Sequence, residues 1–199
     1  MKKDTIIEAG LNAIPYVGGS LATLYYGSKN EKKFERLENF YKELKEEMDK
    51  NPIDVSGFTN HNEEELENVI SDLNDKVEKE TREEKRKYLK HFFISTIETP
   101  IQNDFDERNA FLDILDGMTV VECKLLDFLS KQQDPIQIRN LTGEDIYVLY
   151  GAVNKLISYG FLEARRGNFT MNGAQDEKLD DLIFTSVYGK RFIEYIRMN

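Results

Sequence analysis

The side chains that most often perform chemistry in proteins are sparse in this chain of 199 residues. The histidines are His61 and His91, and the one cysteine is Cys123. A structural zinc site needs about four such ligands held together, so the sequence predicts no metal. It also contains no P-loop glycine pattern for phosphate and no G-x-S-x-G turn of a serine hydrolase. We therefore expect no cofactor.

Carboxylates are plentiful between residues 104 and 116, where five stand: Asp104, Asp106, Glu107, Asp113 and Asp116. Catalysis by paired acids needs two carboxyl groups whose surroundings push their pKa values apart. Asp113 and Asp116 are three residues apart and share one face of a predicted helix. On an amphipathic helix such acids more often form a solvated surface, and we therefore expect a protein that is not an enzyme.

Basic and amide side chains in the last part of the chain are the candidates for nucleic-acid contact. They are Asn154, Lys155, Arg165, Arg166, Lys190 and Arg191. The first two lie on a predicted helix over 143–158, and the next two at a predicted hairpin tip. Arg, Lys, Asn and Gln are the side chains that read bases and hold phosphates. However, Glu144 and Asp145 at the start of that helix oppose a phosphate backbone, so DNA binding is an alternative hypothesis.

A stretch of 18 residues, Ala9 to Tyr26, carries no charge. A membrane-spanning helix needs about 20 apolar residues, and here a proline and a glycine pair divide the stretch into two predicted short helices. Small residues spaced four apart allow close helix contact, and tyrosines suit a membrane interface. The predicted hairpin therefore forms protein contacts, including contacts with another copy, or engages a membrane. The residues expected to make these contacts are Pro15, Gly18, Gly19, Ala22, Tyr25 and Tyr26.

The elements that would position these residues are mostly helices. Apolar residues at three- and four-residue steps predict a helix over 30–50 and another that begins at Asn62. Thr81 indicates that this helix breaks and that a new helix starts there, which ends at Thr99-Pro100. Gly117 ends a later helix. Side chains that suit the starting position of a helix are Asn62, Thr81, Asp104, Thr119, Thr142 and Ser186.

After residue 134 short β-prone runs appear at 136–139, 161–165 and 182–187. The order of helix, strand, helix, hairpin, helix is typical of a winged helix. The predicted fold class is therefore mainly α, with a helical hairpin and a long-helix bundle before a winged-helix-like α+β domain. The predicted boundaries are 1–28 for the hairpin, 29–118 for an acidic helical region and 119–199 for the winged-helix-like domain.

The net charge of −10 is concentrated in the middle of the chain. Residues 28–118 contain 15 basic and 24 acidic residues, whereas residues 119–199 contain 10 and 11. An acidic surface repels nucleic acid and attracts basic partners, so an inhibitor of a nucleic-acid enzyme is a further hypothesis. A single cysteine allows no disulfide within the chain and fits a reducing cytoplasm. We expect a cytoplasmic protein, with membrane association left open.

Several segments, taken in order, resemble the abortive-infection alpha type of bacterial and phage proteins. They are IPYVGG, KKFERLENFYKELKEEM, KRKYLKHFFISTI, FLDILDGMTVVECKLLDFL and FTSVYGKRFIEYI. The resemblance implies a mostly helical prophage or phage-defence protein, and it supplies no catalytic residues. The second half departs from it by its more complete winged-helix pattern. We therefore expect a non-enzymatic protein that acts through protein contacts, in which the hairpin oligomerises or meets a membrane.

Overall fold

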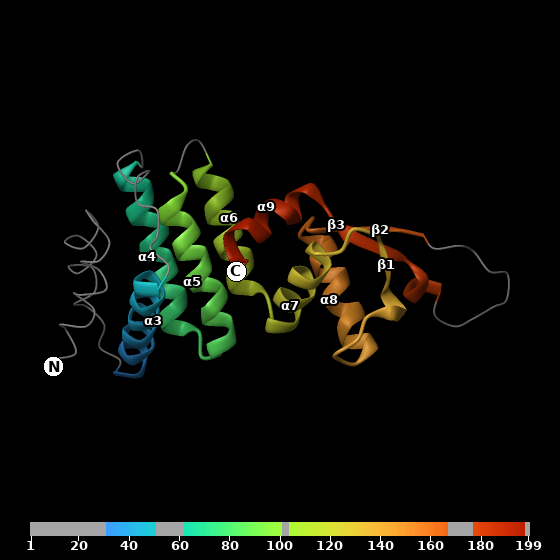
Figure 1. The fold of residues 1–199 in the computed structure, drawn as a ribbon, viewed down its shortest axis with the longest axis horizontal. Coiled ribbons are helices and arrows are strands. Elements are labelled where there is room, and N and C mark those ends of the chain that lie inside the picture. The colour runs from blue at the N-terminus through green and yellow to red at the C-terminus, as the bar shows by residue number, and fades with distance from the viewer. Residues whose placement is uncertain (1–30, 51–61, 101–103, 167–176, 198–199) are drawn as a thin grey trace. The chain divides into compact units, whose positions relative to one another are not determined.

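A computed structural model describes residues 31–50, 62–100, 104–166 and 177–197 (Figure 1). The chain divides into two compact units at Asp116 and Gly117. The described part is mainly helical and carries a small three-stranded sheet in the second unit, which confirms the expected class at this level. The predicted hairpin over 1–28, with all its candidate contact residues, lies outside the described residues.

Four helices make up the described part of the first unit. They are α3 (Glu31–Lys50), α4 (Glu63–Lys79), α5 (Glu83–Glu98) and α6 (Phe105–Gly117). Figure 1 shows α3, α4 and α5 side by side, and all three pairs are in contact. Each contributes an apolar stripe to one core, since residues three and four apart lie on the same face. Its members include Leu37, Tyr41, Leu44, Val69, Leu73, Val77, Leu89 and Phe93.

Aromatic rings fix how α3 meets its neighbours. Phe40, Tyr41 and Phe93 pack edge to face, with ring centroids 5.4–6.2 Å apart. The Tyr41 hydroxyl donates to Asn74 Oδ1 of α4 at 2.7 Å. A buried hydroxyl needs such a partner, and burial raises the pKa of Tyr41. The position of α3 is therefore specified by a hydrogen bond as well as by packing.

The starts of these helices test the sequence predictions. Asn62 is the N-cap of α4 as expected, and its side chain accepts from the amides of Glu64 and Glu65. The break predicted near Thr81 is confirmed, since α4 ends at Lys79 and α5 begins at Glu83. Thr81 as the cap is wrong, because Arg82 occupies that position and gives no side-chain cap. Instead, the Glu80 carboxylate accepts hydrogen bonds from the Arg82 amide and guanidinium, with donor–acceptor distances of 2.7–2.9 Å.

The described part of the second unit interleaves three α-helices with three strands. Its elements are α7 (Val120–Ser130), β1 (Ile136–Gln137), the 3-10 helix η2 (Ile138–Asn140), α8 (Ile146–Ser158), β2 (Leu162–Arg165), the 3-10 helix η3 (Glu177–Asp180), β3 (Leu182–Thr185) and α9 (Val187–Ile196). The sheet order is β1-β3-β2 with antiparallel neighbours. In that register Ile136 is opposite Ile183, and Leu162 is opposite Thr185.

Local signals place most starts of these elements correctly. Thr119 and Glu122 form the expected capping box of α7, and Ser186 caps α9. The helix predicted over 143–158 begins at Ile146, so Thr142 is not its cap. Gly143 has a φ of 106°, in the left-handed region that helices exclude, and Asp145 is the cap instead.

None of the helices in these described ranges is both long and apolar enough to cross a lipid bilayer.

Candidate functional site

The outward side of α8 is an uncharged surface of the second unit. Its inward residues, Leu149, Ala152, Val153 and Leu156, are buried, and α8 packs on α7 and β2. Tyr147 is 62% exposed and Val148 is 50% exposed. The exposed residues of the helix are Tyr147, Val148, Gly151, Asn154 and Ser158, and none is charged. We call these five residues the α8 face.

The N-terminal end of α8 is acidic. Glu144 and Asp145 are both exposed. The Asp145 carboxylate accepts hydrogen bonds from the amides of Tyr147 and Val148 at 2.9 and 3.4 Å. Free amides at a helix N-terminus are a common site for phosphate. Here a side chain of the protein already occupies them, which disfavours a phosphate at this end of α8.

Lys155, a candidate nucleic-acid contact, is held by the protein itself. Its Nζ donates to the carbonyl of Gly117 at 2.9 Å and lies 3.1 Å from Glu122 Oε2. Burial opposes the charged form of Lys155, but the Glu122 carboxylate and the Tyr159 hydroxyl outweigh it and raise the lysine pKa. The same Glu122 carboxylate accepts a hydrogen bond from the Thr119 amide at 2.9 Å. Lys155 therefore ties α8 to the capping box of α7.

The other candidate on α8, Asn154, is exposed. Its side-chain amide donates to the backbone carbonyl of Tyr150, one turn earlier, at 2.9 Å. Lys155 points to α7 and Asn154 is uncharged, so neither presents an unengaged cation on the α8 face.

The four remaining candidates lie on β2, just after it, and on α9. Arg165 ends β2, and its guanidinium lies 4.8 Å from the centroid of the Phe184 ring. Arg166 follows and is exposed. Lys190 and Arg191 are exposed on α9, with Arg191 5.4 Å from the Tyr188 ring centroid. The structure brings Arg165 and Lys190 to one pocket, whose lining includes neither Asn154 nor Lys155.

Two acidic residues of α6 form ion pairs with a lysine of α4. Asp113 and Asp116, the pair weighed for acid catalysis, both face Lys76 of α4, at 2.7 and 3.8 Å. Their side chains are 74% and 48% exposed. In the described ranges no three His, Cys, Asp or Glu side chains come together as a metal site would require.

Sequence reasoning missed a buried arginine. Arg108 is fully buried and donates to the carbonyls of Thr96 and Thr99 at 3.3 and 3.0 Å. Its guanidinium also pairs with Asp104 at 2.6 Å. The only sequence signal is the four-residue spacing of Asp104 and Arg108, which is usual for a surface pair on a helix. Arg108 thus joins the end of α5 to the start of α6 and has a structural role.

No protein-family model, curated protein or solved structure matches this chain significantly. Any function assigned to α8 consequently depends on the chemistry of its own exposed side chains, which are apolar or uncharged rather than basic.

Proposed function

We propose that this protein acts without catalysis, by binding another protein through the α8 face. The observation that carries the proposal is the exposure of Tyr147 and Val148, consecutive residues of a helix whose outward side has no charge. Exposed apolar patches mark contact sites, and tyrosine is enriched where binding energy concentrates. The acidic residues Glu144 and Asp145 border the patch, which favours a partner with a basic rim.

The fold around α8 supports the same proposal. The order α7, β1, α8, β2, β3, α9 with an antiparallel sheet is typical of a winged helix. In that arrangement α8 takes the place of the helix that enters the DNA major groove. Its outward side here fits a protein surface better than a phosphate backbone, so we propose a winged helix used as a protein-contact module.

The biological setting that we propose is phage defence of the abortive-infection type. This rests on the resemblance of the chain to that family and on the non-catalytic character of the α8 face. The predicted N-terminal hairpin would supply oligomerisation or membrane engagement. We propose that the protein works in the cytoplasm, either free of the membrane or at its inner surface.

The α8 face is tested by a double variant, Tyr147→Ser with Val148→Ser. The matched control is Val187→Ser, since Val187 is 77% exposed on α9 of the same unit but lies off the α8 face. Survival and phage yield of infected cells, with co-purification of the partner, are the measurements. We expect the double variant to lose protection and partner while its melting temperature is unchanged. Full protection by the double variant would exclude the α8 face.

The hairpin is tested separately with Gly18→Leu combined with Gly19→Leu. Flotation of the full chain with liposomes reports membrane engagement, and size-exclusion chromatography with light scattering reports oligomerisation. We expect the double substitution to abolish one of these properties, because bulky side chains prevent close helix approach. A variant that protects cells like the wild type would remove the hairpin from the mechanism.

A second candidate function, DNA binding, is favoured by one observation: Arg165, Arg166, Lys190 and Arg191 are all exposed in the second unit. If they hold phosphates, Arg165→Gln with Arg166→Gln should weaken binding to duplex DNA. The salt dependence of the binding constant should then flatten by about one unit of slope per lost contact. Absence of binding to any duplex at low salt would exclude this function.

A further inference from the structure

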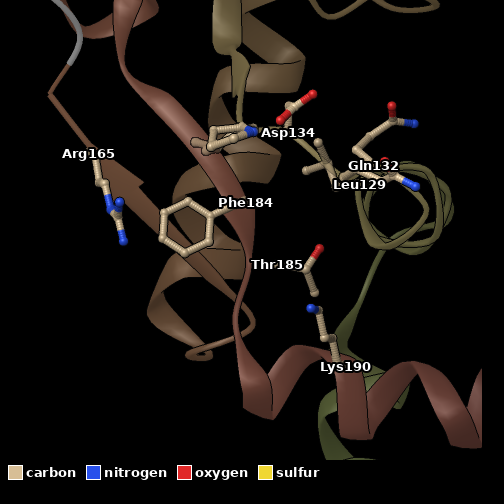
Figure 2. Close-up of a pocket in the computed structure, with 10 residues that line it drawn as sticks. Leu129, Gln132, Asp134, Arg165, Phe184, Thr185 and Lys190 are labelled. Carbon is tan, nitrogen blue, oxygen red and sulfur yellow. The ribbon is translucent and has the colours of Figure 1, made fainter.

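The second unit contains an open pocket of about 160 Å³, and no residue of the α8 face lines it. It lies between the C-terminal end of α7, the segment that follows it, β3 and the first turns of α9 (Figure 2). Its lining residues are Leu129, Gln132, Gln133, Asp134, Pro135, Arg165, Ile183, Phe184, Thr185 and Lys190. Polar and apolar side chains thus line it together, as is usual in ligand sites.

Two cations stand at different ends of this pocket. Figure 2 shows Arg165 beside the Phe184 ring at one end, and Lys190 beside Thr185 at the other. Neither cation forms an ion pair with an acid in the described part of the chain, whereas Lys131, Arg139 and Lys155 of the same unit do. Two separated cations without acidic partners favour a ligand that carries negative charge at both ends.

Arg165 is oriented for such a ligand. Its guanidinium lies over the Phe184 ring, 4.8 Å from the centroid. Stacking on an aromatic face leaves the N–H groups at the edge of the guanidinium available, and their fork matches a carboxylate with two parallel hydrogen bonds. Because the ring restricts the side chain in advance, less conformational entropy is lost when the carboxylate binds.

The buried hydroxyl of Thr185 independently indicates a ligand in this pocket. Thr185 is 8% exposed, and its Oγ1 is buried without a hydrogen-bond partner among the described residues. Figure 2 shows the side chain extending from β3 into the pocket, between Leu129 and Lys190. A buried hydroxyl without a partner costs about 1–3 kcal/mol. A ligand oxygen that reaches the Thr185 hydroxyl would give it the acceptor that it lacks, and Lys190 lies beside the same side chain.

The pocket also contains one acid, Asp134, which bears on the choice of anion. Figure 2 shows its carboxylate turned away from Arg165 and Lys190. Its charge nevertheless leaves the pocket only weakly cationic. Carboxylates carry a single charge each, whereas a phosphate carries up to two, so the balance favours carboxylates over phosphates.

From these observations we infer that the pocket binds a dicarboxylate, with one carboxylate on Arg165 and the other on Lys190 and Thr185. The source is either a free dicarboxylic acid or two acidic side chains of a protein segment, and the chemistry of recognition is the same. The inference does not depend on the α8 face, whose residues lie outside the pocket.

Nuclear magnetic resonance of the full chain tests the inference with defined probes. The ¹⁵N-labelled protein is titrated with the dicarboxylates succinate, glutarate and adipate, and with the monocarboxylates butyrate, valerate and hexanoate. We expect one dicarboxylate to shift the Thr185 and Lys190 amides and the Arg165 Nε–H. Its affinity should exceed that of the matched monocarboxylate about tenfold, the value of one charge-assisted hydrogen-bonding pair. A Glu-x-Glu peptide in a third arm distinguishes a protein segment from a free acid.

Two variants and one control make the test specific. Arg165→Gln should bring dicarboxylate binding down to the monocarboxylate level, about a tenfold loss. Thr185→Val removes the hydroxyl and keeps the β-branched shape, and it should weaken both ligand classes about threefold to tenfold. Arg197→Gln changes the net charge equally at an exposed position outside the pocket lining and should leave binding unchanged.

Four results would overturn the inference. One is that no carboxylate shifts the pocket resonances, and another is that Arg197→Gln weakens binding as much as Arg165→Gln. A third is that sulfate and phosphate shift the same resonances as strongly as the dicarboxylates, which would indicate attraction of any anion. A fourth is that duplex DNA displaces the dicarboxylate and depends equally on Arg165 and Arg166, which would assign the pocket to nucleic acid.

Discussion

Gly189 gives the sharpest prediction about the second unit, because α9 approaches the backbone of Phe161 at this residue. A Cβ added to Gly189 would lie 2.2 Å from the Phe161 carbonyl oxygen, 2.9 Å from its carbonyl carbon and 3.0 Å from its Cα. These are backbone atoms, which cannot turn aside as a flexible side chain can. We predict that Gly189→Ala strongly destabilises the second unit.

The size of the effect follows from the contacts that must open. To reach ordinary van der Waals separation, the start of α9 has to move away from Phe161 by about 1 Å. That movement stretches the hydrogen bond from the Ser186 amide to the Phe161 carbonyl, now 2.9 Å. It also separates the stacked rings of Phe161 and Phe192, whose centroids are 4.3 Å apart. Overpacking and the strained hydrogen bond together cost about 3–5 kcal/mol.

A matched control is available in the same unit. Gly151 lies inside α8, and a Cβ there would meet nothing within 4 Å. Gly151→Ala should therefore stabilise the unit by about 0.5–1 kcal/mol, because alanine loses less backbone entropy than glycine in a helix. The two substitutions are chemically identical, so a difference in sign isolates the contact with Phe161.

Urea unfolding followed by circular dichroism, with amide spectra to assign the transition to the second unit, gives the two free energies. A unit of this size changes its melting temperature by about 4–8 °C for each kcal/mol, so Gly189→Ala should melt well over 10 °C lower. Failure of Gly189→Ala to fold at all would agree with the prediction. An unfolding free energy within about 1 kcal/mol of wild type would refute the close approach of α9 to Phe161.

Two further predictions concern charged groups. The raised pKa of Lys155 means that the stability it contributes is fully present below its ordinary value of 10.5 and is lost as the pH rises through the higher folded value. Urea unfolding between neutral and strongly alkaline pH should show this loss in the wild type and a smaller one in Lys155→Met; identical alkaline slopes would contradict the contact with Glu122. Asp104→Asn should cost about 1–3 kcal/mol, because it removes the charge of a carboxylate that pairs with the fully buried Arg108. Thermal unfolding measures the loss, and an unchanged melting temperature would mean that Arg108 is solvated.

Local patterns in the sequence predicted most of the described helices. The stripe over 30–50 and the caps at Asn62, Thr119 and Ser186 act within one or two turns, so a single short segment contains the whole signal. The errors at Thr81 and Thr142 have local causes as well, since Glu80 and Asp145 bind the amides there instead. Residue type alone does not determine which of several neighbouring polar side chains accepts the hydrogen bonds of the free helix amides.

The candidate sites were predictable only in part. The basic residues of the second unit are visible in the sequence, but their roles are not. Lys155 and Arg165 are both cations on regular elements, yet one is held by Glu122 and the other lies over Phe184. The difference arises because Glu122 and Phe184 are 33 and 19 residues away in the chain. Spacing rules that work within a helix do not reach across such separations.

The sequence by itself determined the helical class of the chain, most of the helix boundaries and the scarcity of catalytic side chains, because periodicity, capping and composition are short-range properties. Tertiary structure alone decided that Arg108 is buried, that Lys155 is engaged, that Tyr147 and Val148 face outward, and that Arg165, Thr185 and Lys190 share one pocket. Burial and ion pairing depend on which distant segments meet. That is set by the packing of whole elements, and no local pattern encodes it.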